Sequence, residues 1–229
     1  MRYAIYFAPP AGSLLWNRAC QWLGRDPLTT GRLKQPAVPG VDPESLSQIT
    51  ASPRRYGFHA TLKPPFRLST TQTTEQLFAS IAEFARTQDA FALPQLEVAR
   101  LGDFLALRPQ HECTRLAQLA ERCVAGFDRF RAAPQASESV QRRHGLDARQ
   151  KSLLRRWGYP YVMDEWRFHM TLTGKVGDGQ IKVLTDFLSA WFESALREPL
   201  VIEDLCVFLE AREGGAFQLV RRFPLAPPG

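Results

Sequence analysis

The chain writes one phrase twice, and this repetition constrains its fold more than any other feature. Residues 58–62 read FHATL and residues 168–172 read FHMTL. Around each copy the predicted elements follow a similar order: a strand, a helix, a long connection, the motif strand, a helix and two further strands. We interpret this order as an internal duplication. It predicts an α+β fold of two lobes related by a pseudo-twofold axis, each lobe with an antiparallel sheet and outer helices.

The expected domain organisation follows from the duplication. Residues 1–229 are predicted to form a single bilobal domain, with motif strands near 57–63 and 166–173 and an active-site cleft between the lobes. The connection over 25–55 is rich in Pro, Gly, Thr and Ser, and we expect only a short helix in it, near 43–50. A connection of this length in a compact domain often belongs to a functional site.

Each motif strand is expected to have two different faces, because side chains alternate along a strand. In the first copy His59 and Thr61 share the polar face, and in the second copy His169 and Thr171 do so. A single His-x-Thr pair is most often a solvated strand face. Two copies at equivalent places in two similar halves predict instead that both pairs converge on one cleft.

Such a cleft would suit a phosphodiester. The unperturbed pKa of histidine, about 6.5, lies close to working pH, so two imidazoles can act as general acid and general base. The hydroxyls of Thr61 and Thr171 would donate hydrogen bonds to the non-bridging phosphate oxygens. The residues leave open which histidine is the acid and which is the base.

Four further residues are candidates for substrate binding, each with a structural alternative. Lys63 would share the polar face with His59 and bind a phosphate oxygen, or else be a solvated lysine at a strand end. Arg167 would clamp a substrate phosphate, or else form a salt bridge with a neighbouring carboxylate. Tyr56 and Tyr159 would stack on a base or sugar, or else belong to the core.

Charge and composition limit the partners. The net charge of +6 favours an anionic ligand, and the basic stretch 142–156 would either grip a second phosphate or RNA or be a solvated helix face. The four cysteines are scattered, and no apolar run approaches the length of a membrane span. We therefore expect a cytoplasmic protein with reduced thiols. His111 and His144 lack partners at metal-ligand spacing, so neither a metal nor another cofactor is predicted.

The paired motifs resemble those of the 2H phosphoesterase superfamily. The wider stretches RRYGFHATLKPPF (54–66) and WGYPYVMDEWRFHMTLTG (157–174) resemble its bacterial branch of phosphonate-metabolism proteins, and the similarity runs along the whole chain. The resemblance implies His59, Thr61, His169 and Thr171 as the active-site quartet. It also implies a bilobal α+β fold and, as substrate, a ribose cyclic phosphate that bears a further phosphate.

The leading functional hypothesis is a metal-independent hydrolase of cyclic phosphodiesters on a ribose or nucleotide, acting as a monomer on a small phosphate ester. A second hypothesis is an RNA-end processing enzyme of the 2′-5′ type, for which RNA would be the partner. A third is a non-catalytic module that binds nucleotide or RNA. Steep salt dependence of RNA binding would favour the second, and tight binding without turnover would favour the third.

Overall fold

The computed structural model describes residues 1–133 and 145–228 of the chain. Its strands are β1 (Arg2–Phe7), β2 (Ala60–Phe66), β3 (Phe91–Ala92), β4 (Leu96–Leu101), β5 (Phe104–Pro109), β6 (Met170–Thr171), β7 (Val201–Ile202), β8 (Asp204–Glu210) and β9 (Phe217–Pro224). Its α-helices are α1 (Leu14–Leu23), α2 (Pro43–Ile49), α3 (Ala51–Tyr56), α4 (Thr74–Arg86), α5 (Thr114–Gly126), α7 (Ala148–Trp157) and α8 (Asp178–Phe192). Three 3-10 turns complete the list: η1 (Asp128–Phe130), η2 (Met163–Glu165) and η3 (Glu193–Leu196).

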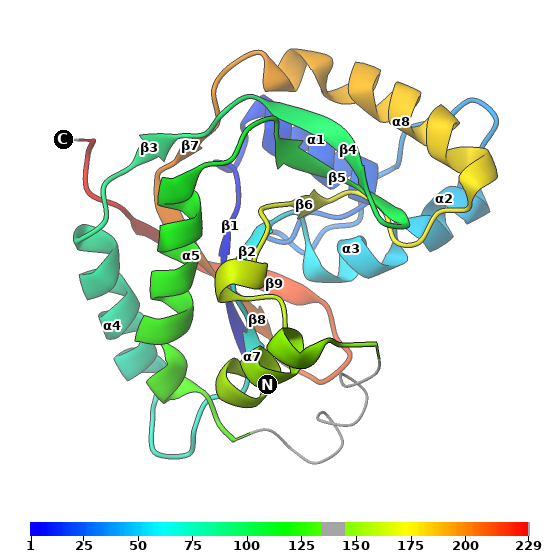
Figure 1. Ribbon diagram of the computed structural model, residues 1–229. Coiled ribbons are helices and arrows are strands. Elements are labelled where there is room, and N and C mark those ends of the chain that lie inside the picture. The colour runs from blue at the N-terminus through cyan, green and yellow to red at the C-terminus, as the bar shows by residue number, and fades with distance from the viewer. Residues whose placement is uncertain (134–144, 229) are drawn as a thin grey trace.

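Seven strands form one antiparallel sheet in the order β4-β5-β6-β2-β1-β8-β9, and β3 pairs with β7 in a small second sheet. Helices and an antiparallel sheet make this an α+β fold, as predicted (Figure 1). The expectation of two separate small sheets is wrong. The two-residue strand β6 pairs with β5 on one side and with β2 on the other, so the sheets of the two halves are joined at their motif strands. Neither half is left with an open edge there, which an unpaired strand would otherwise expose.

The two faces of the sheet carry different clusters of buried side chains, as the alternation along β1 shows. Tyr3, Ile5 and Phe7 enter the larger cluster, whereas Ala4, Tyr6 and Ala8 enter the smaller one. The larger cluster also takes the apolar stripes of α4, α5 and α8, with residues at helical spacing such as Leu77, Ile81 and Ala85. The smaller cluster lies on the face that carries the candidate site.

The connection over 25–55 is largely ordered by two helices that lead to the first motif. The short helix expected near 43–50 is present as α2, and α3 follows it directly. Gly57 ends α3 with a φ of 79°, and a Cβ at this position would lie 2.8 Å from Cβ of Pro27. Only glycine fits this turn, which sends the chain from α3 into the motif strand.

Candidate active site

The two motif strands are neighbours in the sheet. Ala60 of β2 pairs with Met170 of β6 in antiparallel register. One step along this register on either side, His59 lies opposite Thr171 and Thr61 lies opposite His169. The motifs are therefore related by a local twofold, and each histidine faces the threonine of the other copy.

Both histidines are held by the same device. Nδ1 of His59 lies 2.8 Å from the carbonyl oxygen of Gly57, and Nδ1 of His169 lies 2.9 Å from that of Arg167. A carbonyl oxygen can only accept, so Nδ1 carries the proton in each neutral ring. The lone pair of each ring is then on Nε2. At His59 this atom lies 3.3 Å from Oγ1 of Thr61, which donates to it.

A cleft of about 270 Å³ opens over these residues. Its walls come from β1, β2, α3, β6 and the segment after α7. The lining residues are Arg2, Tyr6, Ser52, Pro53, Tyr56, Gly57, His59, Thr61, Pro64, Pro65, Tyr159 and Thr171. Three of the four predicted catalytic residues thus line one cleft, and the fourth, His169, is close enough for its charge to act on His59.

The electrostatics of the pair favour neutral imidazoles. Burial lowers the pKa of His59 to about 4, and a charge on His169 would lower it further, while the bond to Gly57 acts in the opposite direction. Burial also lowers the pKa of His169, against the bond to the Arg167 carbonyl. Protonation of one ring therefore disfavours protonation of the other, which is the arrangement that an acid–base pair requires.

Tyr6 is a contributor that the sequence did not indicate. Its ring stacks on the imidazole of His59, with centroids 3.7 Å apart and planes 17° apart. It lies in a strand of continuous apolar and aromatic residues, YAIYFA, so no pattern distinguishes it from a core residue. Only the pairing of β1 with β2, in which Tyr6 lies opposite Thr61, brings it to the site.

The prediction that Lys63 shares the polar face is wrong. Ile5 and Tyr6 are consecutive in β1, yet they pair with Lys63 and Thr61, so Leu62 is an extra residue in β2. Such a β-bulge reverses the alternation, and it turns Lys63 to the helical side of the sheet. There the buried Nζ donates to the Val124 carbonyl at 2.9 Å and lies 3.5 Å from the Asp128 carboxylate.

Arg167 does not reach the cleft either. Strand β6 begins only at Met170, so the strand alternation does not extend back to residue 167. The exposed guanidinium donates to the backbone carbonyls of Asp164 and Trp166, both at 2.7 Å, and lies beside a different hollow. The carboxylate of Asp164, its expected salt-bridge partner, is paired with Arg149 instead.

Tyr56 and Tyr159 lie where the sequence placed them, in the wall of the cleft. The Tyr56 ring is centred 6.3 Å from that of His59 and stacks on Phe217 at 5.1 Å. Tyr56 therefore belongs to both readings, because it lines the cleft and packs on the smaller core cluster.

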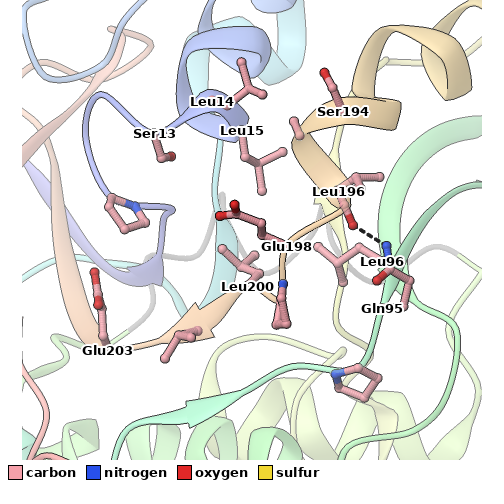
Figure 2. Close-up of a pocket in the computed structure, with 15 residues that line it drawn as sticks. Ser13, Leu14, Leu15, Gln95, Leu96, Ser194, Leu196, Glu198, Leu200 and Glu203 are labelled. Carbon is pink, nitrogen blue, oxygen red and sulfur yellow. Dashed lines mark hydrogen bonds between the residues drawn. The ribbon is translucent and has the colours of Figure 1, made fainter.

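A second hollow, of about 330 Å³, lies between the start of α1 and the segment after α8 (Figure 2). Its walls are largely apolar, and Glu198 and Glu203 are its charged residues. Two carboxylates repel a phosphate. The cleft with the motif residues is therefore the better candidate for an anionic ligand.

Other features bear on the predicted partners. Of the basic stretch 142–156, residues 142–144 lie outside the described part of the chain, as does His144. Within it, Arg149 is paired with Asp164 and Arg156 lies over the Trp157 ring. Among residues 1–133 and 145–228, no group of three or more His, Cys, Asp or Glu side chains could hold a metal ion. Over the same ranges no helix combines the length and the apolar character needed to cross a membrane.

Comparison with known families identifies the chain. The model of a family described as protein of unknown function (DUF1045) matches residues 61–218, which is more than half of the sequence. The chain belongs to this family. Two curated relatives, from Janthinobacterium sp. (strain Marseille) and Laribacter hongkongensis (strain HLHK9), are both called ribose 1,5-bisphosphate phosphokinase PhnN. They are 40% and 38% identical to this DUF1045 chain over 100% and 96% of its length.

The DUF1045 chain spans about half the length of these curated relatives, 51% in each case. Among solved structures, a phosphoesterase matches 98% of both chains with 12% identity and a TM-score of 0.45. E. coli LigT complexed with 3′-AMP matches 98% of both chains with 14% identity and a TM-score of 0.44. The name of the first structure agrees with the resemblance predicted from the paired motifs.

Proposed function

We propose that this protein is a phosphodiesterase that opens a cyclic phosphodiester on a ribose or nucleotide, with two histidines as general acid and general base. The register of β2 against β6 carries the proposal. It brings together two imidazoles whose Nδ1 atoms are both occupied by carbonyl oxygens, so that both Nε2 atoms are available for proton transfer. A symmetric pair of this kind has a direct use in a reaction that needs one proton removed and one delivered.

The reaction is assigned as follows. Nε2 of His59 takes a proton from water as the water oxygen bonds to phosphorus. Nε2–H of His169 gives a proton to the ribose oxygen as its bond to phosphorus breaks, and the hydroxyls of Thr61 and Thr171 donate to the non-bridging oxygens. Afterwards the two histidines exchange protons with solvent and return to the starting state.

The assignment of base and acid rests on burial. The pKa of His59 is about 4, so this ring is neutral in the free protein and ready to accept a proton. A bound phosphate anion raises the pKa of both rings, because an opposite charge favours the protonated form. We assign that proton to His169, since a charge on His59 is opposed by its packing against Tyr6.

The substrate class is supported by the family. The name of the curated relatives points to a phosphorylated ribose, and the resemblance of the motifs points to phosphonate catabolism. The chain spans only half of those relatives, so the kinase activity in their name is not carried over. A ribose that bears a cyclic phosphodiester satisfies both the name and the geometry.

A turnover screen tests the proposal. Wild-type protein is offered ribose 1,2-cyclic phosphates, 2′,3′-cyclic nucleotides and 2′-5′-linked RNA, with and without EDTA. We expect turnover of a cyclic phosphodiester that survives EDTA and is lost in His59→Ala and in His169→Ala. His111→Ala is the matched control, because His111 is an exposed loop histidine away from the cleft and its loss should not change the rate. Full activity in either motif variant, or loss in EDTA, contradicts the mechanism.

A further inference from the structure

The cleft has a second charged end, formed by Arg2. Arg2 and Tyr6 lie on the same face of β1, and both line the cleft that holds His59. At the usual rise of a strand their Cα atoms are about 13 Å apart. Both side chains are long, so the space between the guanidinium and the motif histidines is of the size of a sugar.

Arg2 belongs to an ion network with an excess of positive charge. Glu210 of β8 lies directly opposite Arg2, and its carboxylate is fully buried. The carboxylate accepts from Arg2, with one bond of 2.9 Å from Nη2, and also from Arg55. The backbone N–H of Gly214 donates to it as well, at 3.2 Å. Two guanidinium groups thus share one carboxylate, which leaves a net charge of about +1 at this end of the cleft.

The geometry holds Arg2 in place while Arg55 turns elsewhere. The Arg2 guanidinium lies over the Phe217 ring, 5.7 Å from its centroid. Arg55 lies over the ring of Tyr56 and donates to the Gly215 carbonyl, and it is not part of the cleft wall. Arg55 can therefore balance Glu210 while Arg2 presents its charge to the cleft.

Three phenol groups share the same cleft. Tyr6, Tyr56 and Tyr159 all line it. Burial and the neighbouring Tyr56, Tyr159 and Glu210 raise the pKa of Tyr6 well above its usual range, so its hydroxyl stays protonated and can donate a hydrogen bond. Hydroxyl donors beside a fixed guanidinium suit an anion with several oxygens.

We propose that Arg2, together with the tyrosines of this cleft, forms a subsite for a second phosphate of the substrate, remote from the phosphodiester that reacts. The inference rests on the proposed function and deepens it, because it assigns the substrate class: a sugar that bears both a cyclic phosphodiester and a phosphomonoester. The competing explanation is that Arg2 serves only to neutralise Glu210. The two explanations differ in what loss of Arg2 does to substrates with and without the remote phosphate.

The experiment compares matched substrates. Ribose 1,2-cyclic phosphate and adenosine 2′,3′-cyclic phosphate are each assayed with and without a 5-phosphate (5′ in the nucleotide). Wild-type protein should prefer the 5-phosphorylated member. Arg2→Gln should lower kcat/KM for that member by about 10- to 100-fold, the usual range for a charge-assisted hydrogen bond. It should leave the unphosphorylated member within about threefold, and Arg2→Lys should restore part of the preference.

Arg222→Gln is the matched control. Arg222 of β9 pairs with Asp204 of β8 at 2.8 Å, so its loss also deprives a buried carboxylate of an arginine, but it does not line the cleft. This variant should keep the wild-type preference. Equal losses on both members of a pair in Arg2→Gln, or a wild-type protein without preference, would overturn the subsite.

Failure of the proposed function would be recognised separately. If wild-type protein turns over none of these substrates, the hydrolase proposal fails, and the subsite is then decided by binding. Calorimetry would compare adenosine 3′,5′-bisphosphate with adenosine 3′-monophosphate on the wild-type and Arg2→Gln proteins. Tighter binding of the bisphosphate that disappears in Arg2→Gln supports the subsite, and equal binding of the two nucleotides overturns it.

Discussion

At the scale of single residues, the two motif histidines are oriented by backbone rather than by carboxylates. Each ring donates its Nδ1 proton to the carbonyl of the residue two positions earlier, Gly57 for one and Arg167 for the other. A carbonyl fixes the tautomer and the ring orientation without adding a negative charge beside an anionic substrate. A carboxylate in the same place would raise the pKa of the ring and repel phosphate.

The pH profile should therefore be displaced to the acid side. In the free protein we expect kcat/KM to fall as the pH drops through about 4, where His59 becomes protonated and no longer acts as base. It should fall again as the pH rises through a value below 6.5, where His169 loses the proton that it must deliver. His169→Asn should abolish the alkaline limb and lower the rate by about 100- to 10,000-fold. A profile with an alkaline optimum would contradict these roles.

Lys63 gives a prediction about stability rather than about catalysis. Burial lowers its pKa to about 8, although Asp128 acts to raise it. The folded protein therefore binds fewer protons at this site than the unfolded chain between pH 8 and the usual lysine value of 10.5, so stability from this residue rises with pH over that window. Thermal unfolding should show this rise in wild-type protein relative to Lys63→Met. The variant should keep kcat/KM within about threefold, and a large rise in KM would restore Lys63 as a phosphate ligand.

At the scale of elements, the site depends on how the chain enters β2. Helix α3 ends at Gly57, and the carbonyl of this same residue accepts the Nδ1 proton of His59. The left-handed turn therefore sets the position of the hydrogen-bond acceptor that orients the base. The bulge at Leu62 then ends the regular alternation two residues after Thr61, so only the His-Thr portion of the strand faces the cleft.

Gly57→Ala should damage both the turn and the catalytic geometry. The new Cβ would combine a φ of 79° with a contact of 2.8 Å to Pro27, and we expect a loss of about 1–3 kcal/mol in unfolding free energy. A fall in kcat should accompany it, because His59 shifts with its acceptor. Gly40→Ala is the matched control: its φ is 77°, but no atom lies within 4 Å of the added Cβ. Equal effects of both substitutions on kcat would show that the turn does not position the base.

The same elements explain what the sequence could and could not predict. Strand alternation correctly grouped His59 with Thr61, because that face is set by a regular stretch of backbone. It failed at Lys63, because a bulge depends on the pairing with β1 and leaves no mark in the local pattern. It failed at Arg167 because the strand there is too short. Tyr6 was missed for a related reason, since its role comes from a neighbour more than 50 positions away.

At the scale of the whole molecule, the two halves are interleaved. Strands β8 and β9 belong to the second half in sequence, but β8 pairs with β1 of the first half, so the seven-stranded sheet cannot be divided between the halves (Figure 1). The repeated order of elements predicted the duplication but not this exchange, because local patterns do not encode which distant strands pair. Net charge acts at this scale too, since an excess of +6 draws anionic substrates toward the cleft.

Fragments cut between the halves should not fold alone. Residues 1–110 retain β1 without β8, and residues 111–229 retain β8 without β1. Expressed separately, each should lack a cooperative thermal transition by circular dichroism, whereas co-expression should yield a complex that unfolds cooperatively. Independent cooperative unfolding of either fragment would show that the lobes are autonomous.

The pairing of β1 with β8 also governs the order in which the molecule can be completed. Strand β1 leaves the ribosome among the first residues, and its register partner Glu210 follows Arg2 by 208 positions. Throughout that synthesis one edge of an apolar strand waits without its final neighbour. Contacts of such long sequence separation form slowly and leave strand edges open to other chains. The arrangement that brings Arg2 and Tyr6 into the cleft thus makes this protein a slow folder, and the nascent chain depends on chaperones to keep YAIYFA from pairing elsewhere.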